Sequence, residues 1–96
     1  MKIVMIVHNV AVGEEIDELL EGLGVRCYTK IPNALGRGEL SEPHLDTEVW
    51  PGVNVITLVA VEDDKAGKIM DGIRELRKTL GREGVKGFLI PLEEMT

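Results

Sequence analysis

The segment "VNVITLVAVEDDKAGKIMDGIRELRKTLG", residues 53–81, carries the strongest structural pattern of the chain, because a strand pattern passes directly into a helix pattern. Residues 53–61 are almost continuously apolar and β-branched, which predicts a buried strand. From residue 63 to residue 80 the apolar residues recur with helical spacing, and they are Ala66, Ile69, Met70, Ile73, Leu76 and Leu80. Gly81 suits the end of that helix. The segment therefore predicts a strand followed by an amphipathic helix.

The flanking sequence predicts three further strands and one further helix. "KIVMIVHNV", residues 2–10, predicts a first strand, and residues 13–24 predict a helix with acidic side chains in its first turn and Gly24 at its C-terminal cap. Residues 25–31 alternate apolar and polar and predict a second strand. Residues 85–92 predict a fourth strand, in which Pro91 cannot donate a ladder hydrogen bond. We therefore expect Pro91 near the strand's end, at an edge or at a bulge.

The order β-α-β-β-α-β predicts an α+β fold, the ferredoxin-like sandwich, as a single domain over residues 1–96. In this fold a four-stranded antiparallel sheet carries both helices on one face. Apolar residues occupy both alternating sets of positions in the third strand, so the second face of the sheet also needs cover. Another subunit is the simplest source of that cover.

Composition narrows the classes of function. The formal net charge is −6, from 17 acidic and 11 basic side chains, and no basic face is evident. This argues against a sequence-independent nucleic-acid binder. The first apolar run is too short to insert into a membrane. The single cysteine, Cys27, cannot form an intrachain disulfide, which fits a cytoplasmic protein, and we expect its side chain to be a small buried hydrophobe.

The connection between the second and third strands, about residues 32–52, is the main functional indication in the sequence. Structureless loops longer than about 12–15 residues are uncommon in compact domains and are usually functional or disordered. Near its start, Arg37 stands between Gly36 and Gly38, so its guanidinium is free to bind a phosphate or carboxylate with two hydrogen bonds. Glu39 and Trp50 are candidates for contact with a partner protein, and Trp50 could instead anchor the loop at a subunit interface or stack on a purine.

The same loop contains a candidate metal site with alternating spacing: Glu42, His44, Asp46 and Glu48. In an extended segment these four side chains share one side, and imidazole with carboxylates suits Zn²⁺ or another divalent ion. The alternative is a solvated acidic loop that contacts a target or packs in an oligomer.

The turn "GREGVKG", residues 81–87, admits two interpretations. Its three glycines would let backbone amides approach an anion, with Arg82 and Lys86 supplying positive charge. Alternatively it is only a helix cap and the entry to the fourth strand. His8, near the end of the first strand, is expected to be a structural histidine rather than a ligand. No nucleophile elbow, acid–base pair or closed metal motif is present, so we do not expect an enzyme.

The chain resembles the P-II signalling superfamily, through "IPNALGRGE" (31–39), "LGREGVKGFLIPLEEM" (80–95) and "VWPGVN" (49–54). The divalent-cation-tolerance CutA proteins share this fold and offer an alternative as metal-binding or metal-tolerance proteins. The resemblance implies a non-enzymatic homotrimer that binds an adenine nucleotide (ATP, ADP or AMP) between subunits and contacts a transporter or an enzyme through the long loop. The residues that match effector-binding positions of the family are Gly36, Arg37, Gly84, Lys86 and Gly87, and Gly38 and Arg82 beside them complete the predicted effector-binding set. Gly38 stands where the nitrogen sensors carry Gln, so sensing of 2-oxoglutarate is not expected.

Overall fold

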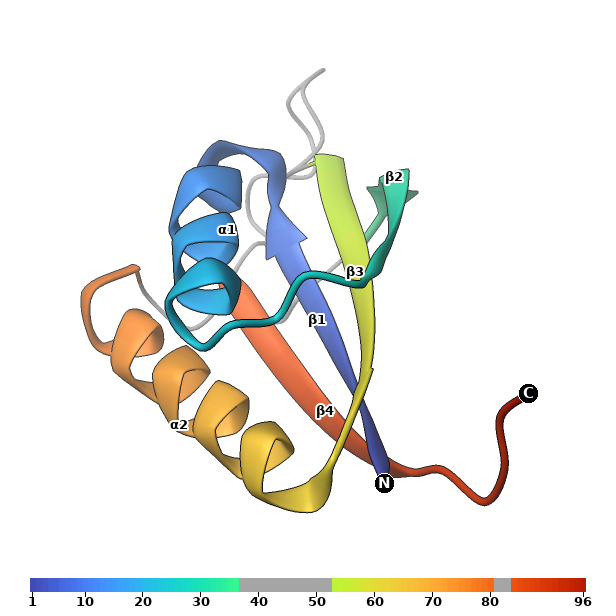
Figure 1. Ribbon diagram of the computed structural model, residues 1–96. Helices are drawn as coiled ribbons and strands as arrows, with labels where there is room; N and C mark the ends of the chain where they lie inside the picture. The colour runs from blue at the N-terminus through green and yellow to red at the C-terminus, as the bar shows by residue number, and fades with distance from the viewer. Residues whose placement is uncertain (37–52, 81–83) are drawn as a thin grey trace.

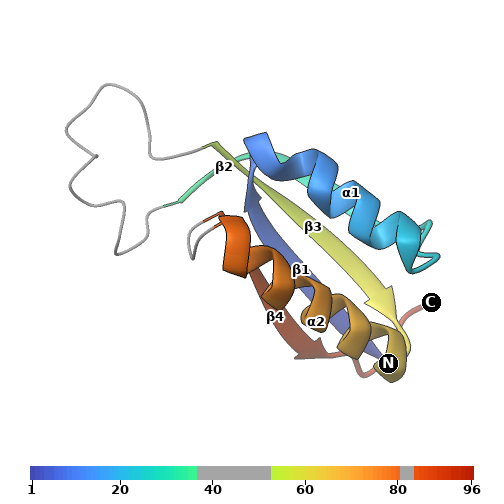
Figure 2. The same cartoon turned by 90° about the vertical axis from the view of Figure 1, so that its left-hand side faces the viewer.

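The computed structural model describes residues 1–36, 53–80 and 84–96. It shows one antiparallel sheet with both helices on one of its faces (Figures 1 and 2), which confirms the predicted ferredoxin-like α+β fold. In chain order the elements are β1 (Lys2–Asn9), a short 3₁₀ turn η1 (Val10–Val12), α1 (Gly13–Gly22), β2 (Thr29–Leu35), β3 (Val53–Val61), α2 (Asp63–Leu80) and β4 (Val85–Pro91).

The sheet has the strand order β2-β3-β1-β4, and every neighbouring pair is antiparallel. β1 is central: it pairs with β3 from Lys2↔Val61 to Asn9↔Asn54 and with β4 from Lys2↔Pro91 to His8↔Val85. Pro91 is the last residue of an edge strand, as predicted, so its missing N–H removes no interior ladder bond.

The core lies between the sheet and the two helices. Alternate residues of β1, such as Val4 and Ile6, are fully buried on the helix side. The helices contribute the apolar stripes that the sequence predicts, and the buried apolar residues of the described chain are Val4, Ile6, Ile16, Leu20, Val25, Val59, Ala66, Ile69, Ile73 and Val85. These side chains are aliphatic, so burial of apolar surface, at about 25 cal/mol per Å², is the main stabilising contribution to the fold.

The end of α1 confirms the cap predicted at Gly24. Gly24 has φ +77°, a conformation that costs a residue with a side chain but not glycine. The Gly24 N–H donates to the carbonyl of Glu21 at 3.0 Å, and the Val25 N–H donates to that of Leu20 at 2.9 Å. These two bonds form a Schellman motif, and the buried Val25 and Leu20 supply its apolar contact.

The prediction for the second strand was wrong in its bounds, because residues 25–28 form an irregular connection and β2 runs from Thr29 to Leu35. The strand passes through Pro32 by means of an irregularity in register between Ile31 and Ala34, where Asn33 has φ +60°. Cys27, predicted to be buried in this strand, is exposed, because it lies in the connection before the strand begins.

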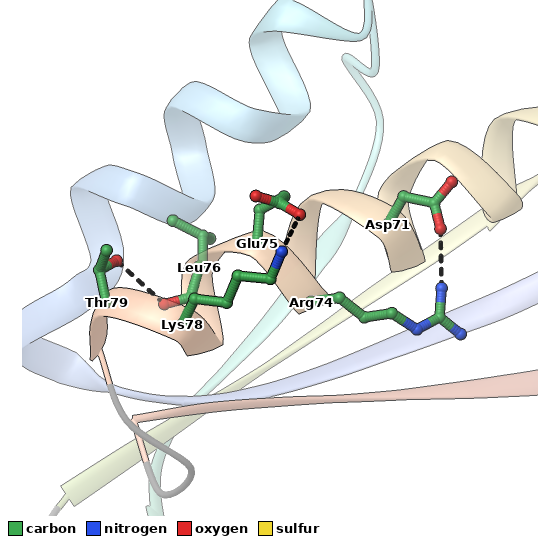
Figure 3. Close-up of polar contacts among 6 residues, drawn as sticks. All are labelled: Asp71, Arg74, Glu75, Leu76, Lys78 and Thr79. Carbon is green, nitrogen blue, oxygen red and sulfur yellow. Dashed lines mark hydrogen bonds and ion pairs between the residues drawn. The ribbon is translucent and has the colours of Figure 1, made fainter.

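The outer face of α2 is a solvated, charge-paired surface (Figure 3). Arg74 donates to Asp71 at 2.7 Å and Lys78 to Glu75 at 2.9 Å, each pair three residues apart. All four side chains are exposed, so each pair stabilises the helix by only about 0.2–0.5 kcal/mol. Neither α1 nor α2 combines the length and the apolar character needed to cross a membrane.

The sheet face opposite the helices is apolar and uncovered in the single chain. Because register partners share a face, this open face is identified from residues that alternate with the buried positions of β1 and from their partners in β3 and β4. It comprises Ile3, Met5, Val7, Ile56, Leu58, Phe88 and Ile90. Phe88 and Ile90 of this face are 38% and 36% exposed. Cover by another subunit stays a prediction, and the open face is the surface that it would cover.

Candidate functional site

Of the residues predicted to bind an effector, four lie in the described parts of the chain: Gly36, Gly84, Lys86 and Gly87. The remaining predicted residues fall outside them. These are Arg37, Gly38 and Arg82 of the effector set, Glu42, His44, Asp46 and Glu48 of the metal set, and Glu39 and Trp50 of the partner set.

Gly36 and Gly84 lie at the same end of the sheet. The Asn9 N–H, at the end of β1, donates to the carbonyl of Gly84 at 3.0 Å. On the other side of β1, Asn9 pairs with Asn54 of β3, whose side-chain amide lies against the backbone of Gly36. The fold therefore brings together the two glycine segments that the sequence separates by almost fifty residues.

Lys86 and Gly87 belong to the start of β4 and face opposite sides of the sheet. A Cβ at Gly87 would lie 2.7 Å from Cδ1 of Ile73 and 3.2 Å from Sδ of Met70, so close packing of α2 accounts for this glycine. Lys86 is on the open face, with Nζ 5.8 Å from the centre of the Phe88 ring. Lys86 is exposed, so its ammonium is accessible to an anion.

His8 is a satisfied structural residue, as the sequence predicts. It is 2% exposed, and Nδ1 lies 3.0 Å from the carbonyl oxygen of Asn9. Because a carbonyl can only accept, Nδ1 carries the hydrogen, which leaves Nε2 to accept from the Thr57 hydroxyl at 3.4 Å. Both ring nitrogens are engaged within the chain, and neither is free for a ligand.

A hollow of about 420 Å³ lies toward the opposite end of the sheet. Its walls are residues 26–29, Leu58–Ala60 of β3, Ile3 of β1 and Met95 of the C-terminal segment. This size lies within the range of small-molecule sites, which are mostly apolar with a few polar groups. Here Leu58 and Ala60 are apolar, whereas Arg26, Tyr28 and Thr29 supply a cation and two hydroxyls.

Sequence reasoning missed this hollow because residues 25–31 were assigned to a strand. In the structure residues 26–28 cross the end of the sheet as an irregular connection. The exposed Tyr28 has the Nζ of Lys30 at 5.4 Å from its ring centre, and Lys30 is in turn held by Asp17 at 2.7 Å. The sequence signal that could have indicated the hollow is the set of polar residues Arg26, Tyr28 and Thr29 shortly after the Gly24 cap.

The hollow and the glycine segments are far apart within the single chain. Ile3 lines the hollow, and Asn9 contacts Gly84, so six residues of extended chain separate the two features along β1. At roughly 3.4 Å per residue this is about 20 Å. A single ligand of nucleotide size cannot contact both features in the same chain.

One carboxylate near the start of β1 has a shifted pKa. The amino group of Met1 lies 3.1 Å from Asp63 and lowers the pKa of that carboxyl, with a further contribution from the charge of Lys2 at 3.5 Å. Because Asp63 is exposed, this contact is a surface ion pair that holds the chain start to the beginning of α2.

No grouping of three or more histidine, cysteine or acidic side chains suited to a metal ion occurs within residues 1–36, 53–80 and 84–96. The predicted metal ligands lie outside these residues, so the described part of the chain gives the metal hypothesis no support.

The fold and the two features define a ferredoxin-like domain with an apolar open face and ligand-accessible groups at both ends of its sheet. The model of the family described as nitrogen regulatory protein P-II matches residues 1–96. The chain therefore belongs to the P-II family, as the resemblance predicts. Members of this family are typically non-enzymatic regulators, and P-II-like proteins generally form trimers and contact protein targets.

Solved structures of P-II-like proteins share the fold. CPII from Thiomonas intermedia K12, bound to ADP, AMP and acetate, superposes with a TM-score of 0.72 at 22% identity, over 93% of this chain and 82% of that one. A second CPII structure, bound to ADP, AMP and bicarbonate, gives 0.71 at 23% identity, over 92% and 81%. A PII-like signalling protein from Thermus thermophilus gives 0.65 at 24% identity, over 92% and 81%.

No curated protein matches the sequence. The family match and these structures are all of P-II or PII-like proteins, so the CutA alternative is not supported.

Proposed function

We propose that this chain is a single-domain, non-enzymatic P-II-like regulator that binds an adenine nucleotide between the subunits of a homotrimer. In this proposal, residues 37–52, with Glu39 and Trp50, contact a partner protein such as a transporter or an enzyme. Membership of the P-II family supports the regulatory class, and the CPII structures, which contain ADP and AMP, favour an adenine nucleotide as the effector. The accessible thiol of Cys27 fits a reducing cytoplasm.

The observation that carries the proposal is the separation of the two candidate binding features in one subunit. The hollow offers apolar and aromatic surface, and the opposite end offers backbone at Gly36 and Gly84 with the ammonium of Lys86 nearby. A nucleotide needs both kinds of surface, one for its base and one for its phosphates. Because one subunit holds them about 20 Å apart, we infer that the hollow of one subunit faces the glycine end of its neighbour.

The open face supplies the surface on which such subunits associate. Met5 lies near its middle, with Leu58 of β3 and Phe88 of β4 as its register partners. Each 100 Å² of apolar surface that a neighbour covers contributes about 2.5 kcal/mol. An uncovered apolar sheet face of this kind is characteristic of a subunit interface.

The hollow would hold the adenine base. The ring of Tyr28 and the side chain of Leu58 provide apolar contact, and the Thr29 hydroxyl provides a hydrogen-bonding group for the edge of the base. The phosphates would then meet the backbone amides and the Lys86 ammonium of the adjacent subunit.

The test is calorimetric titration of the purified protein with ATP, ADP and AMP. We expect binding of at least one nucleotide, and we expect Tyr28→Ala to weaken it about tenfold, the effect of losing about 1.4 kcal/mol of ring contact. Tyr28→Phe, which retains the ring, should bind within about twofold of the original protein. Arg74→Ala, on the outer face of α2, is the matched surface control.

Absence of heat and of any thermal shift with all three nucleotides, in a protein shown to be trimeric, would overturn the nucleotide proposal. Equal affinities for Tyr28→Ala and the original protein would place the base outside the hollow while leaving nucleotide binding intact.

A further inference from the structure

Asn54 is an unexpected residue for its position. It is the second residue of β3, a strand otherwise built from Val, Ile, Leu, Ala and one Thr, and asparagine is among the residues that strands disfavour. Its backbone pairs with Ala34 of β2 on one side and with Asn9 of β1 on the other. Asn54 is half-buried in the interior of the sheet, so its side chain has defined neighbours.

The defined neighbour is Gly36, the residue that follows β2. A Cβ built on Gly36 would lie 2.5 Å from Nδ2 of Asn54, a distance that real Cβ atoms essentially never show. The φ of Gly36 lies outside the left-handed region, so backbone conformation does not require glycine there. The carboxamide of Asn54 therefore fills the space that a Cβ at position 36 would need, and a larger residue at position 36 would have to displace it.

Asn54 also belongs to the row of residues that connects the two glycine segments. Across the end of the sheet, Gly36 contacts Asn54, Asn54 pairs with Asn9, and the Asn9 N–H donates to the Gly84 carbonyl at 3.0 Å. The Asn9 side chain is engaged elsewhere, because its Oδ1 accepts from the Ala11 N–H at 2.8 Å. Within the row, the Asn54 side chain is thus the group that meets the backbone of Gly36.

We propose that Asn54 is a positioning residue of the nucleotide site, whose carboxamide sets the place of the Gly36 backbone relative to Gly84. This inference rests on the proposed nucleotide binding, and it assigns the contact between Asn54 and Gly36 a role in affinity. Displacing either partner changes where the Gly36 amide meets the ligand phosphates. The effect reaches the ligand through Gly36 and requires no direct contact by Asn54.

The experiment is a double-mutant cycle on ADP affinity, measured by calorimetry with Gly36→Ala, Asn54→Ala and the combined variant. Gly36→Ala should weaken ADP binding about tenfold, because the new methyl group and the carboxamide cannot occupy the same space. Asn54→Ala should weaken it about threefold. The combined variant should match Asn54→Ala, since the smaller side chain leaves room for the methyl group.

Two controls separate positioning from general destabilisation. Gly36→Ala combined with Asn54→Leu retains a branched side chain of similar size at position 54 and should not recover affinity. Recovery with leucine as well as with alanine at position 54 would show that the site tolerates either residue there. Gly67→Ala, on an exposed part of α2 where a Cβ meets nothing within 4 Å, should leave ADP affinity unchanged. Each variant is titrated well below its own midpoint of thermal unfolding.

The possible failures are distinguishable. If the original protein binds no adenine nucleotide, the proposed function fails and this inference fails with it. If the original protein binds ADP but the two single substitutions act additively, or shift only the thermal midpoint, then the positioning role alone is overturned.

Discussion

At Gly87, the packing of neighbouring side chains, rather than contact with a ligand, accounts for the identity of the residue. It lies on the helix side of β4 opposite Ile6, and the side chains of Ile73 and Met70 occupy the space that a Cβ would need. The sequence pattern around it suggested an anion-binding turn, and that role stays a prediction. The contact distances show that packing against α2 favours glycine at this position whether or not a ligand binds.

Substitution of Gly87 by alanine should therefore lower the free energy of unfolding by about 1–3 kcal/mol, the usual cost of overpacking a core. Urea denaturation monitored by circular dichroism measures this change. Gly67→Ala is the matched control, and it should instead be neutral or stabilising by up to about 1 kcal/mol, because its site in α2 is open and alanine favours helix. Equal stability of Gly87→Ala and the original protein would show that the Ile73 and Met70 side chains make room for the methyl group at no cost.

Among the elements, β3 and α2 were predicted with correct bounds, residues 53–61 and 63–80. A continuous run of β-branched and apolar residues marks the strand, and the helical spacing of apolar residues marks the buried side of the helix. The bounds of β2 were predicted wrongly because it is an edge strand whose residues are mostly exposed, so burial imposed no alternation on its sequence. Pro32 and Asn33 also interrupt the pairing of β2 with β3, and no local sequence pattern predicts this interruption.

The irregularity in β2 depends on Asn33, which has φ +60°. Asparagine tolerates this conformation, whereas a β-branched residue does not. Asn33→Val should therefore lower the free energy of unfolding by about 1–2 kcal/mol, while Asn33→Gly should equal or exceed the original protein in stability. Thermal unfolding of the three proteins tests this, and because Asn33 is exposed, lost burial does not complicate the comparison. A stable valine variant would mean that β2 can adopt a regular register.

For the whole molecule, the open face is the largest feature that a single chain leaves unexplained. The helices cover one side of the sheet (Figure 1), and apolar residues of three strands line the other. In the proposed assembly this face supports both association and ligand binding, because the two halves of each nucleotide cleft come from different subunits.

A charge at the centre of the open face should disrupt this assembly. Met5→Lys would place an ammonium between Leu58 and Phe88, where burial against another subunit leaves it without a partner. Light scattering after size exclusion should give about three times the 10.6 kDa chain mass for the original protein and the single-chain mass for the variant. Arg74→Glu, on the outer face of α2, should keep the original mass. A Met5→Lys protein that retains the full mass would place the interface elsewhere.

The candidate site was only partly accessible from sequence. Gly36, Gly84 and Lys86 were singled out because glycine and lysine next to a loop have recognisable chemistry, and the fold does gather them at one end of the sheet. Asn54 and Tyr28 were not singled out, since their significance lies in which residues are opposite them. Asn54 acquires its neighbour through the register of β2 with β3, and Tyr28 borders a hollow whose other wall comes from β3.

Apolar periodicity and turn chemistry are local properties, so the amino-acid sequence was enough to predict the order of elements, the buried helix stripes and the Gly24 cap. Register, the contact of Asn54 with Gly36 and the distance between the hollow and the glycine end depend on pairing between strands far apart in the chain. Those features exist only once the sheet has formed, because long-range hydrogen bonding sets which residues face each other across it.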